Sequence, residues 1–303
     1  MIHLLKDSMT QSTNGVLIIN KPSGLTSHDV VHAIRRIVGQ RSVGHLGTLD
    51  PMATGVLPIV LGNMTRLAQF YLKSEKSYEG MIRFGFPTDT YDSEGEPLRE
   101  EQELKLSFEQ LREIAASFHG VIEQVPPPFS AKKIQGVPAY KLARKKKEVP
   151  LRPVQVEIKE FEVLHLENNC ASFRSRVSSG TYVRSIAHEL GQLAGCGAHL
   201  QALCRSSVAE FSLAEAQTLD QLELAVQAGE LESMLVHPRK LLPNMPSVTA
   251  SEEIASRIRH GQAVNVPELS RAPEVKVFYG QRDLICIATR IAGTLVHPKI
   301  VFA

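Results

Sequence analysis

Two long stretches in the middle of the chain alternate between apolar and polar residues, and this pattern constrains the fold more than any other feature. They read VQVEIKEFEVLHL at residues 154–166 and CASFRSRVSSG at residues 170–180. Alternation places apolar side chains on one face of a strand and polar side chains on the other. The two stretches therefore predict paired antiparallel strands with one solvated face. Helical patterns occur elsewhere without regular strand–helix–strand alternation, so the class we predict is α+β.

Shorter patterns locate the neighbouring elements. Residues 16–19 (VLII) predict a buried strand that the turn NKPSG ends. Residues 26–39 predict a helix that Thr26 or Ser27 caps and Gly39 closes. A capping box of Ser107 and Gln110 predicts a second helix, which Gly120 ends. The remaining patterns predict strands at 56–62 and 77–86 and helices at 64–72, 181–195 and 213–235.

The end of the chain differs in composition from the rest. Residues 241–248 (LLPNMPSV) contain two prolines and an asparagine and predict a linker. One short helical pattern and three short β patterns follow it. We expect a boundary at residue 246, with residues 247–303 forming a compact β-rich module. A segment of this size is too small for much independent stability, so it should pack against the main body.

Several functional classes lack their sequence signals in these 303 residues. No apolar run approaches the roughly 20 residues that span a bilayer, and no secretory signal precedes the first strand, so we expect a cytoplasmic protein without membrane contact. The four cysteines form no CxxC pair, and HExxH, GxxxxGK[ST] and GxGxxG motifs are absent. The sequence therefore predicts neither a metal site nor a nucleotide cofactor.

The charge of the chain is concentrated locally, although its net value is only +2. Residues 131–152 carry eight Lys or Arg residues and one Glu, whereas residues 89–113 carry nine acidic and three basic residues. A concentrated basic segment suggests contact with a polyanion. A solvated helix face would explain the same composition.

A loop rich in Gly and Pro, GHLGTLDPMATGVLP at residues 44–58, contains the first candidate for chemistry. Glycines allow the backbone to come close to a bulky partner, and Asp50 lies beside a proline that fixes the turn. Asp50 could be a nucleophile, a general base or a metal ligand, or it could cap an Asx turn. His45 could be a base or a stacking surface, but no triad or further metal ligand accompanies it.

A second constellation, SSGTYVRS at residues 178–185, begins a predicted helix and contains Tyr182 and Arg184. An arginine there can hold a carboxylate through a bidentate pair, although pairing with Glu189 or with solvent would be unremarkable. Tyr78 could be a core tyrosine or could stack on a nucleobase.

Six motifs together resemble one known family, the TruB-type tRNA pseudouridine synthases, in order and spacing. The similarity covers residues 16–212 closely, and the end of the chain, from RIRHGQAVNV onward, is similar to the PUA-like domain of bacterial members. The motifs are INKPSG, GHLGTLDPMATGVLPIVLG, SYEGMIRFG…TDTYDSEG, VPPPFSAKKIQGVPAYKLARK, SSGTYVRSIAHELG and CGAHLQALCRS.

The resemblance implies a fold and a reaction. The fold would be a mixed, largely antiparallel central sheet flanked by helices, with residues 1–246 as the catalytic domain. The reaction would convert uridine to pseudouridine in the T-loop of tRNA, at position 55 in tRNA numbering, without a cofactor. The family further implies a stand-alone monomer without an obligate protein partner. It also implies that the protein could assist tRNA folding.

The resemblance also implies roles for individual residues. Asp50 matches the catalytic aspartate, which either attacks C1′ or deprotonates C2′, and Arg184 matches the arginine paired with it. Tyr78 matches the aromatic residue that stacks on the target base. The residues that match the uridine pocket and the space vacated by the everted base are Tyr182, Leu203 and His45.

RNA contacts outside the pocket are implied as well. Lys21 in NKPSG would support the site or the backbone contact, and Arg66 stands where the family often has Lys. The basic insertion at about residues 124–152 would close over RNA, with Lys132, Lys133 and Arg144 among its contacts. Cys204 departs from the LRR pattern of the family, which puts one expected contact in doubt.

Two alternatives remain open at this point. The chain could bind or fold RNA with a vestigial site, or it could be a sister enzyme that works within a guide-RNA complex. The long basic insertion and the short final module favour the stand-alone enzyme.

Overall fold

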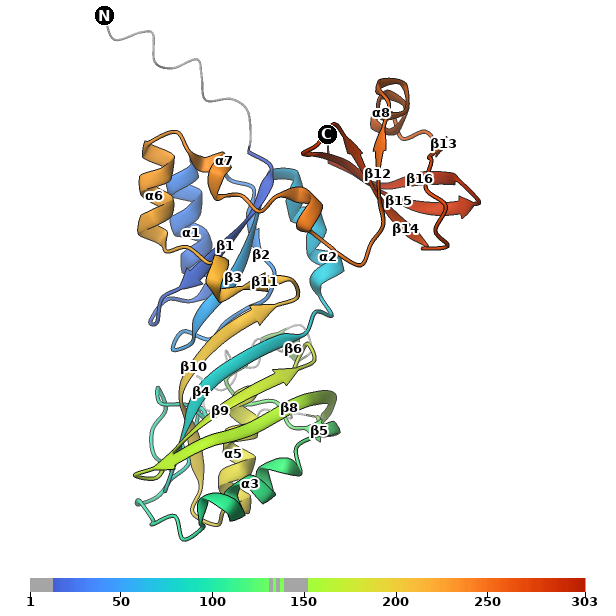
Figure 1. The fold of residues 1–303 in the computed structure, drawn as a ribbon. Coiled ribbons are helices and arrows are strands. Elements are labelled where there is room, and N and C mark those ends of the chain that lie inside the picture. Colours follow the sequence, from blue (N-terminus) through green and yellow to red (C-terminus); the bar gives the residue numbers. More distant parts are fainter. Residues whose placement is uncertain (1–12, 131–132, 135–136, 139–151, 303) are drawn as a thin grey trace, which may run out of the picture.

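The computed structural model describes residues 13–130, 133–134, 137–138 and 152–302, and it is built on one large mixed sheet (Figure 1). The order across the sheet is β1-β3-β10-β4-β9-β8-β5, while β2 pairs with β3 and β11 with β10. Every pairing is antiparallel except β3 with β10. The bounds are β1 Gly15–Lys21, β2 Val43–His45, β3 Thr54–Leu61, β4 Lys76–Phe84, β5 Gly120–Gln124, β8 Val154–Glu167, β9 Cys170–Val177, β10 Ala198–Val208 and β11 Phe211–Ser212.

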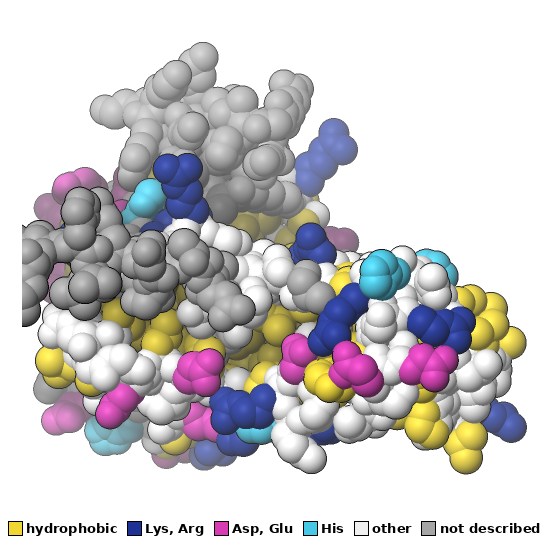
Figure 2. All heavy atoms as spheres, turned by 90° about the horizontal axis from the view of Figure 1, so that it is seen from above, with side chains coloured by type: hydrophobic (Ala, Val, Ile, Leu, Met, Phe, Trp, Pro, Cys, Tyr) yellow, Lys and Arg dark blue, Asp and Glu magenta, His cyan; other side chains and the backbone are white. Residues whose placement is uncertain are grey.

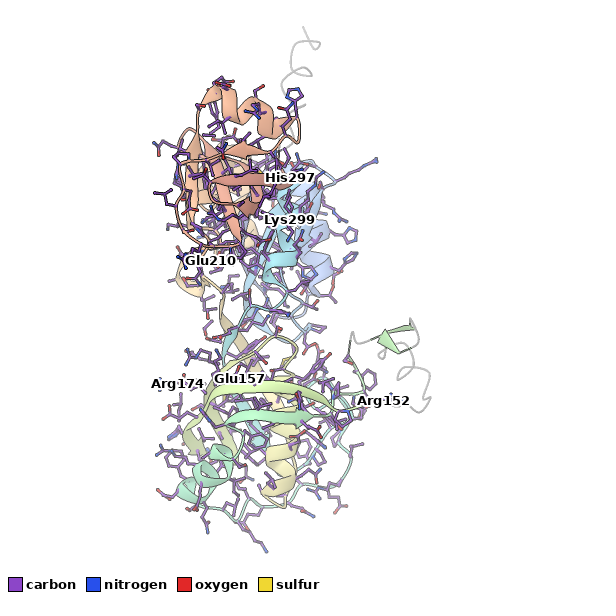
Figure 3. The ribbon with its side chains drawn as sticks, turned by 90° about the vertical axis from the view of Figure 1, so that its right-hand side faces the viewer. Arg152, Glu157, Arg174, Glu210, His297 and Lys299 are labelled. Atoms are coloured by element: carbon purple, nitrogen blue, oxygen red, sulfur yellow. The ribbon has the colours of Figure 1, made fainter. Side chains whose placement is uncertain are left out.

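The predicted pairing of the two alternating stretches is confirmed by β8 and β9, which are antiparallel neighbours. Apolar residues such as Val163 and Phe173 are buried. On the solvent side, Arg174 forms ion pairs with Glu160 at 2.9 Å and with Glu162 at 2.8 Å, and Figure 3 shows Arg174 at the edge of the molecule. The α+β class is confirmed.

Helices cover the sheet near both ends (Figure 1). The helix α1 packs on α6, and α5 packs on α3 and β10. Thr26, rather than Ser27, caps α1 in a capping box, Ser107 does the same for α3, and Gly39 closes α1 at φ +68°. The bounds are α1 Ser27–Val38, α2 Ala68–Tyr71, α3 Phe108–Ala116, α5 Val183–Leu193, α6 Leu219–Gln227 and α7 Leu231–Met234.

Three helix predictions were wrong in extent. Residues 64–72 form the 3-10 helix η1 (Gly62–Leu67) and then the short α2, because the hydroxyl of Thr65 bonds back to the carbonyl of Gly62 and tightens the turn. Residues 213–235 divide into η2 (Leu213–Glu215), α6 and α7, because the Thr218 capping box starts α6 and Gly229, at φ +76°, follows its end. The second helix ends at Ala116, and Gly120 begins β5.

The last part of the chain forms a second sheet of five strands in the order β12-β14-β15-β16-β13, with α8 against it. Buried residues of this part of the chain, including Phe278, Ile287 and Phe302, share one core with Leu67 and Phe211 of the main body. The module therefore packs against the main body, as predicted. The bounds are β12 Ser247–Ala250, α8 Glu252–Arg259, β13 Val264–Asn265, β14 Glu274–Tyr279, β15 Asp283–Ala292 and β16 Leu295–Val301.

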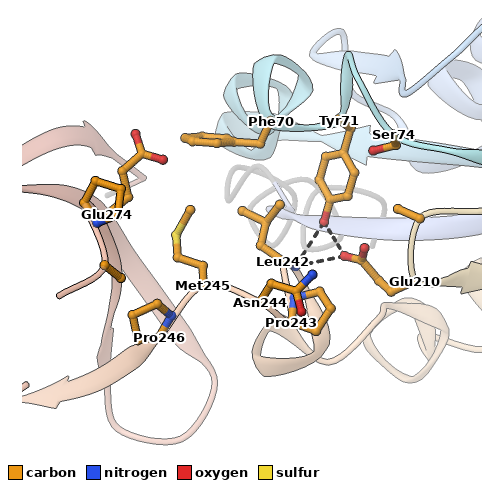
Figure 4. Close-up of a pocket in the computed structure, with 13 residues that line it drawn as sticks. Phe70, Tyr71, Ser74, Glu210, Leu242, Pro243, Asn244, Met245, Pro246 and Glu274 are labelled. Carbon is orange, nitrogen blue, oxygen red and sulfur yellow. Dashed lines mark hydrogen bonds between the residues drawn. The ribbon is translucent and has the colours of Figure 1, made fainter. Parts of the chain in front are cut away.

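Polar contacts fix the chain between the two sheets, next to the 3-10 helix η3 (Pro238–Lys240). Glu210 accepts hydrogen bonds from the Tyr71 hydroxyl at 2.5 Å and from the Leu242 amide at 2.8 Å (Figure 4). The buried Lys276 ammonium donates to the carbonyls of Leu241 and Leu242. Tyr71, Glu210 and Leu242 line a junction cavity of about 600 Å³. Figure 3 shows Glu210 below the module that carries His297 and Lys299.

Two short strands, β6 (Lys133–Ile134) and β7 (Val137–Pro138), pair with each other within the basic insertion. No helix among the described residues has the length and apolar character needed to cross a membrane. On the face drawn in Figure 2, acidic and basic side chains lie interspersed over the described surface.

One close backbone approach in the main sheet can be tested by mutation. A Cβ atom at Gly55, where φ is +99°, would lie 2.3 Å from the backbone oxygen of Arg205, whereas at Gly229 it would meet nothing within 4 Å. Gly229→Ala should cost about 1 kcal/mol for its backbone conformation alone, and Gly55→Ala about 1–3 kcal/mol more because β3 must move from β10. Urea unfolding of both variants measures the difference. Equal losses would contradict the close approach.

Candidate active site

The loop that carries Asp50 connects β2 to β3 and projects from the main sheet. The Asp50 carbonyl accepts a hydrogen bond from the Ala53 amide at 3.1 Å, which closes the turn at the tip. Gly47 at φ +129° and Gly55 at φ +99° adopt backbone conformations that favour glycine. The Gly residues of the loop therefore set its path, and they bring its start and its end close to β10.

Arg205, a fully buried residue of β10, fastens one side of this loop. Its guanidinium donates to the carbonyl oxygens of Val56 at 2.8 Å, Gly47 at 3.0 Å and Thr48 at 3.2 Å. These acceptors lie before and after the tip, so a single side chain holds both limbs of the loop. Sequence reasoning missed this role, because the CRS of the sixth motif does not show which way the arginine points.

Lys21, the last residue of β1, fastens the other side. Its fully buried ammonium donates to the carbonyls of Leu25 at 2.6 Å, Pro22 at 2.8 Å and Pro51 at 3.0 Å. Burial lowers the pKa of Lys21 to about 8, although the Asp50 carboxylate opposes this shift. The structure thus places Lys21 beneath the loop as a support, and its ammonium is engaged by the backbone. Ser27 adds a contact by accepting from the Leu49 amide at 2.8 Å.

Asp50 faces Arg184, which lies in the first turn of α5. Arg184 Nη2 donates to Asp50 Oδ1 at 3.0 Å, and Nε lies 2.9 Å from Oδ2 without hydrogen-bond geometry, so one hydrogen bond and one close ionic contact reach the two oxygens. The Arg184 side chain is 5% exposed, whereas that of Asp50 is 34% exposed. The guanidinium is therefore part of the interior, while the carboxylate keeps a face open to a cavity.

A second carboxylate, that of Asp92, contacts the same guanidinium of Arg184. Asp92 is buried, and its Oδ2 lies 3.2 Å from Arg184 Nη1. The same guanidinium donates to the carbonyls of Thr90 and Phe129. Sequence reasoning missed Asp92, because an acid within an acidic stretch carries no local sign of burial; only its place in the motif TDTYDSEG set it apart.

The environment shifts the pKa of the Asp50 carboxyl upward. Burial is the largest cause, Arg184 opposes it through its charge and its hydrogen bond, and Asp92 adds to the rise. The pair with Arg184 thus counteracts the cost of burying the carboxylate.

A cavity of about 320 Å³ lies on the open side of Asp50, and the structure brings Asp50, Tyr78, Tyr182, Arg184 and Leu203 together around it. Tyr78 of β4 lies directly opposite Arg205 in β10, and burial raises its pKa. The Gln124 side chain exchanges two hydrogen bonds with the Tyr182 backbone and so positions Tyr182 at the start of α5. Burial also raises the pKa of Tyr182, so both phenols are neutral near pH 7.

A larger cavity of about 690 Å³ adjoins the first and shares Asp50 and Arg184 with it. His45 lines this second cavity together with His28, Asp92 and Glu94. Burial and the charge of Arg205 lower the pKa of His45, and its Nδ1 accepts from the Gly47 amide at 3.3 Å. His45 is therefore a neutral ring beside the Asp50 carboxylate, separate from Tyr78.

The other predicted RNA contacts lie elsewhere. Arg66 is exposed and donates to the carbonyl of Val301 at 2.7 Å, at the junction with the second sheet. Lys132 and Arg144 lie outside the described residues, and Lys133 belongs to β6. Within the described part of the chain, no group of three or more His, Cys, Asp or Glu residues could hold a metal ion.

Comparisons with known proteins agree with the resemblance. Residues 35–183 match the family model "TruB family pseudouridylate synthase (N terminal domain)", and residues 184–243 match the model "tRNA pseudouridylate synthase B C-terminal domain". The chain is 48% identical to tRNA pseudouridine synthase B of Solibacter usitatus over 95% of this chain and 99% of that relative. It is 40% identical to the protein of the same name from Geotalea uraniireducens, over 88% and 89% of the two chains.

Two solved structures share the fold. One is a chain in a structure of an H/ACA RNP bound to a substrate RNA containing 2′-deoxyuridine, with a TM-score of 0.70 and 23% identity over 95% of this chain and 85% of that one. The other comes from a Cbf5-Nop10-Gar1 complex, with a TM-score of 0.69 and 24% identity over the same shares. At these identities the likeness concerns the fold alone.

Because Arg205 holds the Asp50 loop, we expect a large loss of stability when the Arg205 side chain is replaced. Arg205→Met leaves one buried and two partly buried carbonyls without their donor and should cost about 3–5 kcal/mol. Arg174→Met, which removes an arginine that is 54% exposed from β9 of the same sheet, should cost at most about 1 kcal/mol. Urea unfolding followed by circular dichroism measures both. A small loss for Arg205→Met would show that the loop does not depend on it.

Proposed function

The chain belongs to the TruB family of pseudouridylate synthases, and we propose that it converts uridine to pseudouridine at position 55 in the T-loop of tRNA. It is an isomerase that acts on tRNA, as the family and its named relatives are. The single observation that supports the proposed site is the ion pair of Asp50 with Arg184, at the wall of a cavity that also holds Tyr78.

The reaction needs a carboxylate next to the ribose. The N1–C1′ bond of uridine breaks, the uracil ring rotates, and C5 bonds to C1′; C5 then loses its proton, and N1 ends protonated. Positive character develops at C1′ during the first step, and a nearby carboxylate can stabilise or trap it. Asp50 either attacks C1′ or takes the proton from C2′, and both routes begin with an ionised carboxylate whose free face meets the cavity.

Arg184 keeps the carboxylate ready for this step. Its two contacts with Asp50 orient both oxygens and favour the ionised form against the cost of burial. Asp92 and two backbone carbonyls hold the guanidinium in place, so its direction does not depend on the substrate. Such preorganisation avoids rearrangement in the transition state.

The base must leave the folded RNA loop to reach this depth, and unstacking it costs a few kcal/mol. We assign stacking on the uracil ring to Tyr78, and the remaining walls of the pocket to Tyr182 and Leu203, which line the same cavity. His45, in the adjoining cavity, would occupy the space that the base vacates. The neutral ring suits insertion into a base stack.

The partners and domains are part of the proposal. Residues 1–246 would form the catalytic domain and residues 247–303 a PUA-like RNA-binding domain, mounted by the shared core. Lys132, Lys133 and Arg144 would contact RNA from the basic insertion. We further propose that the enzyme acts alone as a cytoplasmic monomer.

Replacement of Asp50 tests the catalytic assignment. Asp50→Asn keeps the size of the side chain but removes the negative charge, so turnover should fall by about a thousandfold or more, while tRNA binding stays within about threefold. Release of tritium from tRNA labelled at C5 of uridine measures turnover. Asp220→Asn, an exposed change in α6, serves as the control with normal turnover. Tritium release by Asp50→Asn at the wild-type rate would contradict the assignment.

The purified chain tests the stand-alone proposal against a role inside a guide-RNA complex; one structural neighbour comes from an H/ACA RNP bound to a substrate RNA. We expect the protein alone to release tritium from a bare T-arm stem-loop, because the described site needs no second chain to complete Asp50, Arg184 and Tyr78. Binding of the stem-loop without any release would instead indicate a vestigial site or a missing partner.

A further inference from the structure

One cation of the catalytic cavity has no assigned task. Lys76, the first residue of β4, lines the cavity with Asp50, Tyr78 and Arg184. A Cβ atom placed on Gly47 would lie 3.7 Å from Lys76 Cε, so the lysine stem runs alongside the loop that carries Asp50. Its charged end is thus part of the catalytic cavity and not of the outer surface.

The strand pattern explains this orientation. Lys76 and Tyr78 are two residues apart in β4 and share a face of the sheet, whereas Glu75, just before the strand, turns the other way and pairs with Lys159. Two residues of strand span about 6.6 Å. This is comparable to the separation between the base and the phosphate of a single nucleotide, so a base stacked on Tyr78 would bring a phosphate near Lys76.

The ammonium of Lys76 has donors to spare. An ammonium has three N–H groups, and one donates to the Ser74 carbonyl at 2.6 Å. Among the ion pairs of the described residues none involves Lys76. Burial and the neighbouring Arg205 lower the pKa of Lys76 to about 8. The lowered pKa means that the environment destabilises the charged ammonium, and an anionic ligand beside it would stabilise the charge.

The other cations near the cavity are already engaged. Arg205 is fully buried with its donors on three backbone carbonyls, and Lys21 is fully buried in the same way. Arg184 is held between two carboxylates. Among the cations described here, Lys76 is therefore the one placed to meet an anionic group of the substrate inside the cavity.

We propose that Lys76 binds a phosphodiester group that flanks the everted uridine, and that this contact anchors the nucleotide with its ribose at Asp50. The inference rests on the proposed function, since it takes RNA as the ligand. Lys76 is then a substrate-binding residue whose charge is matched to the backbone of the RNA and not to its base.

A binding experiment tests the contact without turnover. In the Asp50→Asn background, Lys76→Met should weaken binding of a T-arm stem-loop about fivefold and reduce the slope of log affinity against log salt by about 0.7–0.9. Lys73→Met, which removes an exposed lysine outside the cavity, is the matched control with a smaller change. The Lys76→Met effect should disappear on a stem-loop in which an uncharged methylphosphonate replaces the contacted phosphate.

The pH dependence gives an independent readout. The pKa values of Tyr78 and Tyr182 are raised, and burial lowers the pKa of Arg205. Lys21 also has a pKa of about 8, but its ammonium is engaged by three backbone carbonyls. Because the pKa of Lys76 is lowered to about 8, the lysine is charged below pH 8 and loses its proton above it. Affinity of the Asp50→Asn protein should fall between pH 7 and pH 9. Lys76→Arg, which stays charged, should lose less affinity over that range, and its remaining loss would come from Lys21.

The outcomes separate the two proposals. If the wild-type chain releases no tritium from tRNA, the proposed function fails, whatever Lys76 does in the binding experiment. If the wild type turns over and Lys76→Met binds with unchanged affinity and salt slope, the phosphate contact is wrong. A loss of rate with unchanged binding would also overturn it, because Lys76 would then act only on the position of the loop at Gly47.

Discussion

The rest of the active site depends on one buried guanidinium, that of Arg184. It joins four segments that are far apart in the chain: the Asp50 loop, the turn at Asp92, the backbone at Phe129 and its own helix α5. A buried charge is tolerated only where it is paired and hydrogen-bonded. The four segments must therefore fold together around it. The carboxylate of Asp50 is 34% exposed, whereas that of Asp92 is 4% exposed, so chemistry becomes available at the open face of Asp50.

The Asp50 loop is held by its backbone and not by its side chains. Arg205 and Lys21 hold the loop through its carbonyl oxygens, and each approaches from a different strand, β10 and β1. This arrangement leaves the side chain of Asp50 free to face the cavity while its main chain is fixed. It also surrounds one carboxylate with the positive charges of Lys21, Lys76, Arg184 and Arg205. Such a field suits a polyanionic substrate such as RNA, and it explains why cations recur in a site whose reacting group is an acid.

The second sheet also supports the Asp50 loop. Its apolar residues join a core that contains Leu46 and Val56, which flank the Asp50 loop, and the contacts of Glu210 and Lys276 clamp the connecting chain from both sides. A module mounted in this way presents its surface in a constant direction relative to the cavity. Its contribution to the molecule thus includes support for the catalytic loop, in addition to any contact with RNA.

The sequence by itself determined the α+β class, the antiparallel pair β8–β9, the caps of α1 and α3 and the presence of a β-rich final module, because these follow from periodicity and capping within short windows. Through the resemblance it also singled out Asp50, Arg184, Tyr78, Tyr182 and Leu203, which the fold then placed around one cavity. Only the tertiary structure revealed Asp92, the inward direction of Arg205, the support by Lys21 and the position of Lys76. Burial, and the partner that each charge meets, are set by strands and loops distant in sequence, and a local pattern of residues cannot record them.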